Sequence, residues 1–334
     1  MILDIFFLVC GIALLVAGGN YLTDGAVAVA RRFHFSSMLI GLTVVALGSS
    51  MPDIVVCVEA AIRHKTAIAL GDVVGANIFD ILLVVGIMAL VRPWSVSDQM
   101  RREDLPILAL SSVALWAVGN TILFDGTSEN VVDRSSGILL LVIFIMYMVN
   151  TIREARSGNI PSSAGGKEGN AEAAVAKPLP SARSRIISWI KIGGGLAALV
   201  LGGNWIVDGA SGIALKAGMT QGMVALTVVA IGNSLPDLVT SVVATVKGEP
   251  RLAFGNIVGS CVLNILCGLG LAATVSPLYS DSIGLVDYLT LAGAAVLLSI
   301  IPAVSPKRMI SRPVGMVLVA SYVAYMCYVI ISAN

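Results

Sequence analysis

The sequence contains few charged residues. Asp, Glu, Lys and Arg together make up 12% of its 334 residues, whereas soluble domains carry about a quarter. Hydrophobic residues make up 57%. A chain this apolar is not a water-soluble globule, so we expect an all-α polytopic membrane protein whose surroundings are the lipid bilayer. The formal net charge of +1 gives no basis for binding nucleic acid.

Histidine and cysteine are also scarce. The two histidines, His34 and His64, lie between apolar runs, and the five cysteines lie within them without metal-ligand spacing. Buried cysteines of this kind usually act as small packing residues. An intramembrane enzyme would need histidine, a nucleophile or a metal triad inside its spans. The sequence therefore disfavours an enzyme and predicts no cofactor.

The apolar runs predict ten membrane-spanning helices, because a span needs roughly 20 apolar residues. The first run has no basic leader or clear cleavage site, so we interpret it as a retained span. Residues 155–182 are rich in Gly, Ser, Ala and Pro and predict a flexible linker between two five-helix repeats, 1–154 and 183–334. The predicted spans are 3–31, 36–62, 66–91, 104–123, 134–153, 186–215, 219–246, 250–275, 284–303 and 312–332.

The two predicted repeats share a sequence motif. LTVVALGSSMPD ends at Asp53 and LTVVAIGNSLPD ends at Asp237, an offset of 184 residues. The same offset relates the two halves without a gap from Gly18 to Gly86. The chain is therefore a duplicated unit, and each copy carries one acidic residue inside an apolar run.

The distribution of basic residues predicts the orientation. With the N-terminus outside, 17 Lys and Arg residues fall in inside loops and 4 in outside loops. This predicts that both termini are outside the cell membrane and that the linker is cytoplasmic. Each repeat has an odd number of spans, so the second repeat is inverted. Inverted repeats are typical of secondary transporters, with the site between the repeats near the middle of the bilayer.

Glycine and proline interrupt the apolar run before each acidic residue. Pro52 has no N–H to donate to the carbonyl of Gly48, so we expect a helix break that frees carbonyl groups near Ala46. A carbonyl in a membrane interior needs a partner, and a cation can serve. The corresponding residues of the second copy are Pro236, Gly232 and Ala230.

Polar side chains share a helical face with each aspartate. Ser49 and Ser50 lie four and three residues before Asp53, and Asn233 and Ser234 precede Asp237 in the same way. Hydroxyl, amide and carboxylate oxygens are hard ligands that suit Ca²⁺, Na⁺ or K⁺. The motif therefore predicts a cation site.

The third and eighth spans supply further candidates. GDVVGANIFD ends at Asp80 and GNIVGSCVLN ends at Asn264, and the Gly-x-x-x-Gly spacing in both permits close helix approach. Ser260 lies on the same face as Asn264, and Asn77 lies near Asp80. We interpret Glu59 and Asp72 as interfacial.

Asp53 and Asp237 have two interpretations. They are cation ligands, or they are buried neutral carboxylates that only lock helices together. A charge at the bilayer centre costs about 2.5 kcal/mol on insertion scales, and packing gives no reason to place one at the same point of both copies. We therefore favour the cation ligands, and we extend this interpretation to Asp80.

With these residues the sequence resembles the cation/calcium antiporter superfamily, specifically the sodium/calcium exchangers. The resemblance covers both repeats and implies ten helices, with bent second, third, seventh and eighth helices around the site. It also implies alternating access by sliding of the first and sixth helices. It implies that the transported cations are Ca²⁺ and Na⁺, that Asp53 and Asp237 are the central Ca²⁺ ligands, and that Ser49, Ser50, Ser234 and the carbonyls of Ala46 and Ala230 serve Ca²⁺ or Na⁺. The full set of candidate cation ligands in the sequence is Thr43, Ala46, Ser49, Ser50, Asp53, Asn77, Asp80, Thr227, Ala230, Asn233, Ser234, Asp237, Ser260 and Asn264.

The sequence departs from the family pattern at three places. Asp53 and Asp237 stand where the family usually has Glu, and Ala76 stands where it usually has Ser. NIFD, ending at Asp80, resembles the potassium-binding segment of the potassium-dependent branch but lies in the first copy. If Asp53, Asp80 and Asp237 are all ionised, the site carries three negative charges. One bound Ca²⁺ neutralises two of them. The third could be neutralised by K⁺ or a proton, or could stay uncompensated. The hypothesis is Na⁺/Ca²⁺ exchange, with K⁺ co-transport as a further option.

Other functions remain open at this point. A proton-coupled antiporter for Ca²⁺ or another divalent cation could share the fold, and dependence on the coupling ion separates the two. A cation channel is disfavoured, because channels usually obtain symmetry by oligomerising, whereas this duplication is internal. No protein partner can be inferred from the sequence.

Overall fold

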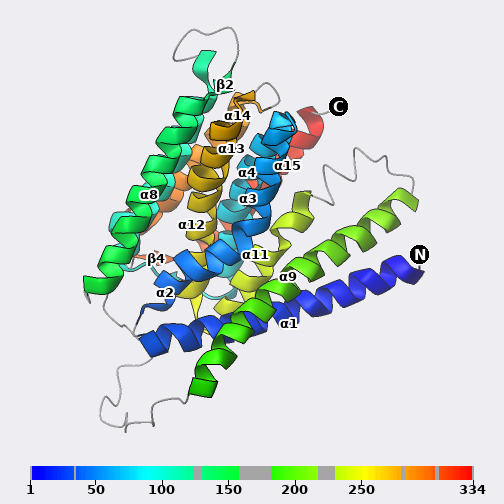
Figure 1. The fold of residues 1–334 in the computed structure, drawn as a ribbon, viewed down its shortest axis with the longest axis vertical. Coiled ribbons are helices and arrows are strands. Elements are labelled where there is room, and N and C mark those ends of the chain that lie inside the picture. The colour runs from blue at the N-terminus through cyan, green and yellow to red at the C-terminus, as the bar shows by residue number, and fades with distance from the viewer. Residues whose placement is uncertain are drawn as a thin grey trace.

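The structure is a computed structural model that describes residues 2–33, 35–122, 130–157, 182–216, 230–279, 283–304 and 308–332. Helices dominate these residues (Figure 1). In the first repeat they are α1 (Ile2–Phe33), α2 (Ser37–Ile40), η1 (Gly41–Val45), α3 (Ala46–Ile62), α4 (Thr66–Ile78), η2 (Phe79–Val84), α5 (Val85–Val91), η3 (Met100–Asp104), α6 (Leu105–Gly119) and α8 (Arg134–Ser157). In the second they are α9 (Ala182–Lys216), α11 (Ala230–Val246), α12 (Pro250–Val262), η5 (Leu263–Leu269), α13 (Gly270–Val275), α14 (Leu285–Val304) and α15 (Arg312–Ser332).

The expectation of a polytopic helical membrane protein is confirmed. The described residues contain 8 helical segments long and apolar enough to cross a membrane. The shorter helices α6 and α11 occupy two further predicted spans. Residues 217–229, where the seventh predicted span begins, lie outside the described residues, so ten crossings stay a prediction. Most of the predicted linker also lies outside them.

Helices α1 and α9, which correspond in the two repeats, pack side by side and antiparallel (Figure 1). Gly11 meets Gly202 and Gly18 meets Gly195, so their backbones come into direct contact. With the offset of 184 residues, each of these contacts is the symmetry image of the other. The halves are therefore related by an approximate two-fold axis, which gives them opposite orientations.

Other contacts between the two repeats also occur twice, as pairs related by the approximate two-fold axis. Strand β1 (Trp94–Ser95) pairs antiparallel with β4 (Met309–Ile310), and β2 (Val131–Val132) pairs antiparallel with β3 (Leu278–Tyr279). Gly86 in α5 approaches the carbonyl of Gly315 in α15, and its image Gly270 in α13 approaches that of Gly137 in α8. A helix of each repeat thus packs against the last helix of the other repeat.

Ion pairs at the helix ends agree with the predicted alternation of loops. Lys247 lies 2.7 Å from Asp24, and Arg308 lies 2.6 Å from Asp98. Lys247, Arg308 and Asp98 lie in loops that the sequence places on the same membrane face, and Asp24 lies in the half of α1 that leads to that face. The pairing of Lys216 with Asp4 joins two segments predicted on the opposite face. These contacts show which segments lie on the same face of the molecule. Which face is outside the cell stays a prediction.

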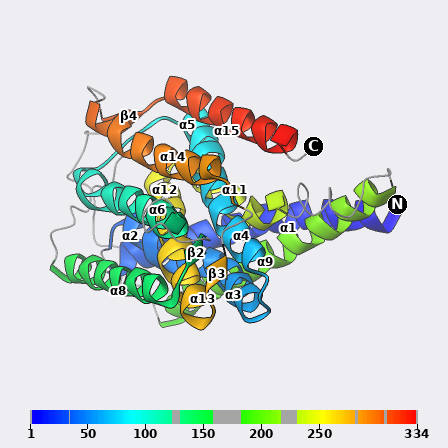
Figure 2. The same cartoon turned by 90° about the horizontal axis from the view of Figure 1, so that it is seen from above.

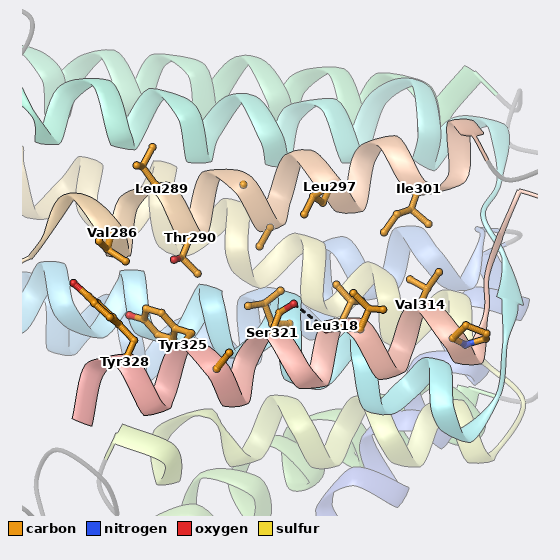
Figure 3. A pocket seen from close by; sticks show the side chains of 16 residues that line it. Val286, Leu289, Thr290, Leu297, Ile301, Val314, Leu318, Ser321, Tyr325 and Tyr328 are labelled. Atoms are coloured by element: carbon orange, nitrogen blue, oxygen red, sulfur yellow. Dashed lines mark hydrogen bonds between the residues drawn. The ribbon is translucent and has the colours of Figure 1, made fainter. Parts of the chain in front are cut away.

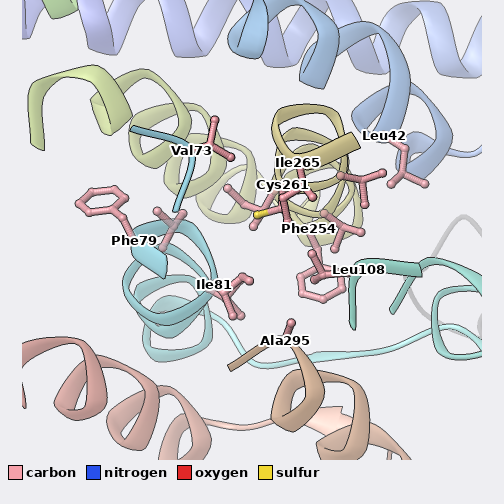
Figure 4. Packing of buried hydrophobic residues seen from close by; sticks show 14 of the residues in the cluster. Leu42, Val73, Phe79, Ile81, Leu108, Phe254, Cys261, Ile265 and Ala295 are labelled. Atoms are coloured by element: carbon pink, nitrogen blue, oxygen red, sulfur yellow. The ribbon is translucent and has the colours of Figure 1, made fainter. Parts of the chain in front are cut away.

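Helix α12 forms the centre of the molecule. Every residue from Leu252 to Val262 is buried, and the helix lies inside the ring of α2, α3, α6 and α11 (Figure 2). Phe254, Cys261 and Ile265 project into the surrounding core (Figure 4). In contrast, α15 keeps an exposed apolar surface, which includes Val317 and Ile331. Such a surface is typical of a helix that faces lipid.

The α1–α9 contact gives a test of the fold. A Cβ atom at Gly195 would lie 2.6 Å from the backbone nitrogen of Leu22. Replacing Gly195 with Val should therefore force the two helices apart, and such overpacking costs about 1–3 kcal/mol. We expect a lower melting temperature for the detergent-solubilised protein.

Gly194→Val is the matched control, because the described residues place no atom within 4 Å of a Cβ at Gly194. Both changes put the same side chain in the same helix. Equal melting temperatures for the two variants would contradict the described packing of α1 against α9.

Candidate cation site

The helices that carry the predicted motifs are distorted by π-helical turns. Segment η1 precedes α3, and η2 and η5 begin at Phe79 and Leu263, which correspond in the two repeats. A π-helical turn often marks a functional site, because it shifts backbone hydrogen bonds out of register. The distortions therefore lie beside the predicted ligands in both repeats.

The expected break around Pro52 takes a different form. Helix α3 continues through Pro52, and the irregular turn lies earlier, at Gly41–Val45. The carbonyl of Ala46 is not vacant, because it accepts a hydrogen bond of 3.3 Å from the Ser49 hydroxyl.

Asp237 lies in a polar pocket made by three helices. Its side chain is 6% exposed, and its Oδ1 accepts a hydrogen bond of 3.0 Å from Nδ2 of Asn256 in α12. The hydroxyls of Ser49 in α3 and Ser260 in α12 also interact with this carboxylate. A first-repeat residue thus contributes to the surroundings of the second-repeat aspartate.

Asp53 is also held by the opposite repeat. Its Oδ2 accepts a hydrogen bond of 3.3 Å from Nδ2 of Asn264 in η5. The other amide atom of Asn264, Oδ1, is buried and has no hydrogen-bond partner within the described ranges. The amide nitrogen therefore faces the carboxylate, and the amide oxygen is a buried acceptor without a described donor.

Serine hydroxyls join the two repeats between these aspartates. Ser50 donates to Ser260 at 2.9 Å, and Ser49 lies 3.3 Å from both Ser260 and the side-chain oxygen of Asn256. Ser50 and Ser260 are fully buried. We call Ser49, Ser50, Asp53, Asp237, Asn256, Ser260 and Asn264 the polar junction.

Asp80 and Asn77 lie next to the polar junction and are buried. The Oδ1 atom of Asp80 and both amide atoms of Asn77 have no hydrogen-bond partner in the part of the chain that the structure describes. The charge of Asp80 interacts with those of Asp53 and Asp237. Buried polar groups of this kind need a partner, because leaving them unpaired costs free energy.

The remaining predicted residues are less informative. Ser234 is buried in α11, one turn before Asp237. The hydroxyl of Thr43 donates to the carbonyl of Leu39 at 2.7 Å. Ala230 is the first residue of α11. The side chain of Asn233 and all of Thr227 lie outside what the structure describes.

The sequence reasoning missed Asn256 and Asp72 as participants in the site, and two further buried polar residues nearby. Asn256 was not selected, although it is a polar residue between the paired glycines of α12. Asp72, its counterpart in the first repeat, was interpreted as interfacial, but it is partly buried and its charge acts on Asp53. Comparing polar positions between the repeats would have identified both. Thr240 and Ser241, buried just after Asp237, were also missed.

An apolar groove of about 760 Å³ lies elsewhere, between α14 and α15 (Figure 3). Leu297 and Leu318 line its middle, and Leu289, Tyr325 and Tyr328 line one end. None of the described residues that line it carries a carboxylate. The groove is therefore distinct from the candidate cation site.

Asn256 gives the first test of the site. Replacing it with Ala removes the amide that orients Asp237, and losing such an outer partner typically costs about 10–100-fold in metal affinity. We expect Ca²⁺ to raise the melting temperature of Asn256→Ala only at correspondingly higher concentrations.

Asn20→Ala is the control, because the Asn20 amide donates to the carbonyl of Val16 in α1, away from the polar junction. Calcium stabilisation that is the same in Asn256→Ala and wild type would contradict a role for Asn256 in orienting Asp237.

Comparisons with known proteins agree with this arrangement. The family model described as "Sodium/calcium exchanger protein" matches residues 3–153 and 187–331. The inner membrane protein YrbG of Escherichia coli is 32% identical, with 98% of this chain and 96% of that protein covered. The sodium/calcium exchanger MaX1 of Methanosarcina acetivorans is 27% identical, with 97% of each covered. The solved sodium-calcium exchanger NCX_Mj superposes with a TM-score of 0.80 at 26% identity, over 98% of both chains. The chain belongs to the sodium/calcium exchanger family.

Proposed function

We propose that this antiporter exchanges Ca²⁺ for Na⁺, and that both cations bind at the polar junction and Asp80. The proposal is carried by one observation: carboxylates from both repeats lie together with amide and hydroxyl oxygens at the buried centre of the helix bundle. These oxygens are the ligands that Ca²⁺ and Na⁺ prefer. The names of MaX1 and NCX_Mj support the same pair of ions.

Competition at a shared site would couple the two fluxes. The carboxylates are costly to bury without a counter-charge, so the protein is most stable with cations bound. Either one Ca²⁺ ion or several Na⁺ ions can supply that counter-charge. An unloaded site would be the unfavourable state, which favours exchange over leak.

Alternating access requires that the site open to one side at a time. We propose that α1 and α9 slide together across the rest of the bundle. The views from two directions support this, because both helices run obliquely to the remaining bundle and extend beyond it (Figures 1 and 2). Helix α1 also contacts α11, and α9 contacts α3, the two helices that carry the aspartates.

Asp80 makes K⁺ co-transport possible in the same scheme. With Asp53, Asp80 and Asp237 ionised, bound Ca²⁺ leaves one negative charge, which K⁺ could neutralise. The potassium-like NIFD segment supports this finer proposal. We also propose residence in the cell membrane with both termini outside and a cytoplasmic linker, which the distribution of basic residues supports.

The proposed exchange is tested by Ca²⁺ uptake into Na⁺-loaded proteoliposomes, with and without K⁺. We expect wild-type uptake to require internal Na⁺, and Asp53→Asn and Asp237→Asn to lose it. Asp80→Asn should abolish any stimulation by K⁺. Asp98→Asn is a suitable control, because Asp98 pairs with Arg308 at a helix end.

The coupling ion is tested in the same vesicles. Uptake that follows an imposed pH gradient and ignores Na⁺ would replace the proposal with proton-coupled divalent cation antiport. Uptake that persists in Asp53→Asn would remove the polar junction from the mechanism altogether.

A further inference from the structure

The two repeats correspond in shape but differ in charge. With the offset of 184 residues, Asp72 and Asp80 of the first repeat correspond to Asn256 and Asn264 of the second. Asp53 and Asp237 correspond to each other. Three of these four carboxylates therefore come from the first repeat, and each repeat surrounds its motif aspartate differently.

Asp72 lies beside Asp53 because α3 and α4 pack antiparallel. Cys57, one turn after Asp53, approaches the carbonyl of Ala69, one turn before Asp72, at 3.8 Å. In the second repeat, the corresponding residues Asn256 and Asp237 are hydrogen-bonded at 3.0 Å. The charge of Asp72 also acts on Asp53.

The first repeat has Asp72 where the second has Asn256, and this difference changes what each residue can bind together with its motif aspartate. An asparagine amide donates to a carboxylate, as Asn256 does to Asp237, whereas an ionised aspartate only accepts. Two adjacent carboxylates repel one another, and a cation between them relieves the repulsion. Asn264 adds an independent indication of a ligand: it is 1% exposed, its Nδ2 faces Asp53, and its Oδ1 has no hydrogen-bond partner among the described residues.

We propose that Asp72 and Asp53 form a subsite in the first repeat for a hard cation, Na⁺ or Ca²⁺, and that the Asn264 amide, whose nitrogen faces Asp53 without the ion, rotates to turn its unpaired oxygen to the bound cation. Asp72 is the seventh residue of α4, which follows the turn that connects α3 to α4. A cation arriving from that membrane face meets two carboxylates, Asp72 and Asp53, at nearly the same depth. The opposite face has the neutral Asn256 in the equivalent place, so the two approaches to the site differ in charge. This inference rests on the proposed function of the polar junction.

Asp72→Asn is the decisive variant, because the second repeat already accommodates asparagine at this position. We expect the Ca²⁺ concentration for half-maximal uptake to rise about tenfold, equivalent to about 1.4 kcal/mol. The maximal rate should stay within about twofold of wild type. Asp72→Glu, which keeps the charge, should restore the half-maximal concentration to within about threefold.

A thermal melt separates binding from a structural role. Without added Ca²⁺ or Na⁺, the Asp72→Asn variant should melt no lower than wild type, because the repulsion between two carboxylates is removed. Stabilising this variant with Ca²⁺ should require a higher Ca²⁺ concentration than stabilising wild type. Glu59→Gln is the control, since the exposed Glu59 in the same repeat pairs with Arg63 at 2.5 Å. It should change neither measurement.

Two outcomes would overturn the subsite. One is an unchanged Ca²⁺ dependence in Asp72→Asn, and the other is a lower ion-free melting temperature with no rescue by Asp72→Glu. Failure of Na⁺ coupling in wild type would reject the proposed exchange alone, because the Ca²⁺ dependence of melting still reports on Asp72.

Discussion

Negative charge buried among apolar helices is the constraint on which the rest of the structure depends. Asp80 is 1% exposed and Asp237 is 6% exposed, and an uncompensated charge in such surroundings is expensive. The hydrogen bonds described for Asp53 and Asp237 come from neutral groups: asparagine amides for both and, for Asp237, also the hydroxyls of Ser49 and Ser260. The ion pairs described for Lys247 and Arg308 lie at the helix ends. Neutral donors orient the carboxylates without cancelling their charge, which leaves that role to a mobile cation.

The two-fold arrangement explains how a short chain builds this centre. Each repeat alone presents one motif aspartate and a distorted helix, and neither encloses a site. Packing the inverted copies together places Asn264 against Asp53 and brings Ser49 toward Asp237. The scaffold contacts repeat closely, as the glycine pairs of α1 with α9 show. Symmetry therefore supplies the framework, whereas the chemistry is free to diverge between the copies, as it does at Asp72 and Asn256.

The sequence predicted the framework well, because duplication and apolar length are both readable along the chain. The predicted spans 66–91 and 250–275 correspond closely to α4–α5 and α12–α13, and membership of the exchanger family is confirmed. The π-helical turns were not predicted, because they depend on tertiary contacts that apolar periodicity does not record. Asn256 could have been selected from the sequence, because it corresponds to Asp72, but its hydrogen bond to Asp237 appears only when α12 packs against α11. The assignment of the site residues as cation ligands stays a prediction.

The strengths of the contacts indicate where the molecule can rearrange. Helix α12 is buried along its length, and moving its apolar side chains would open costly cavities. Across the polar junction, the repeats are joined by neutral or singly charged hydrogen bonds such as those of Ser50 with Ser260 and Asn264 with Asp53. A typical hydrogen bond contributes about 0.5–1.5 kcal/mol net, which is small beside the interaction of a cation with several carboxylates. Cation binding can therefore change the junction while the packed core keeps its shape, and this is the division of rigidity that an antiporter needs.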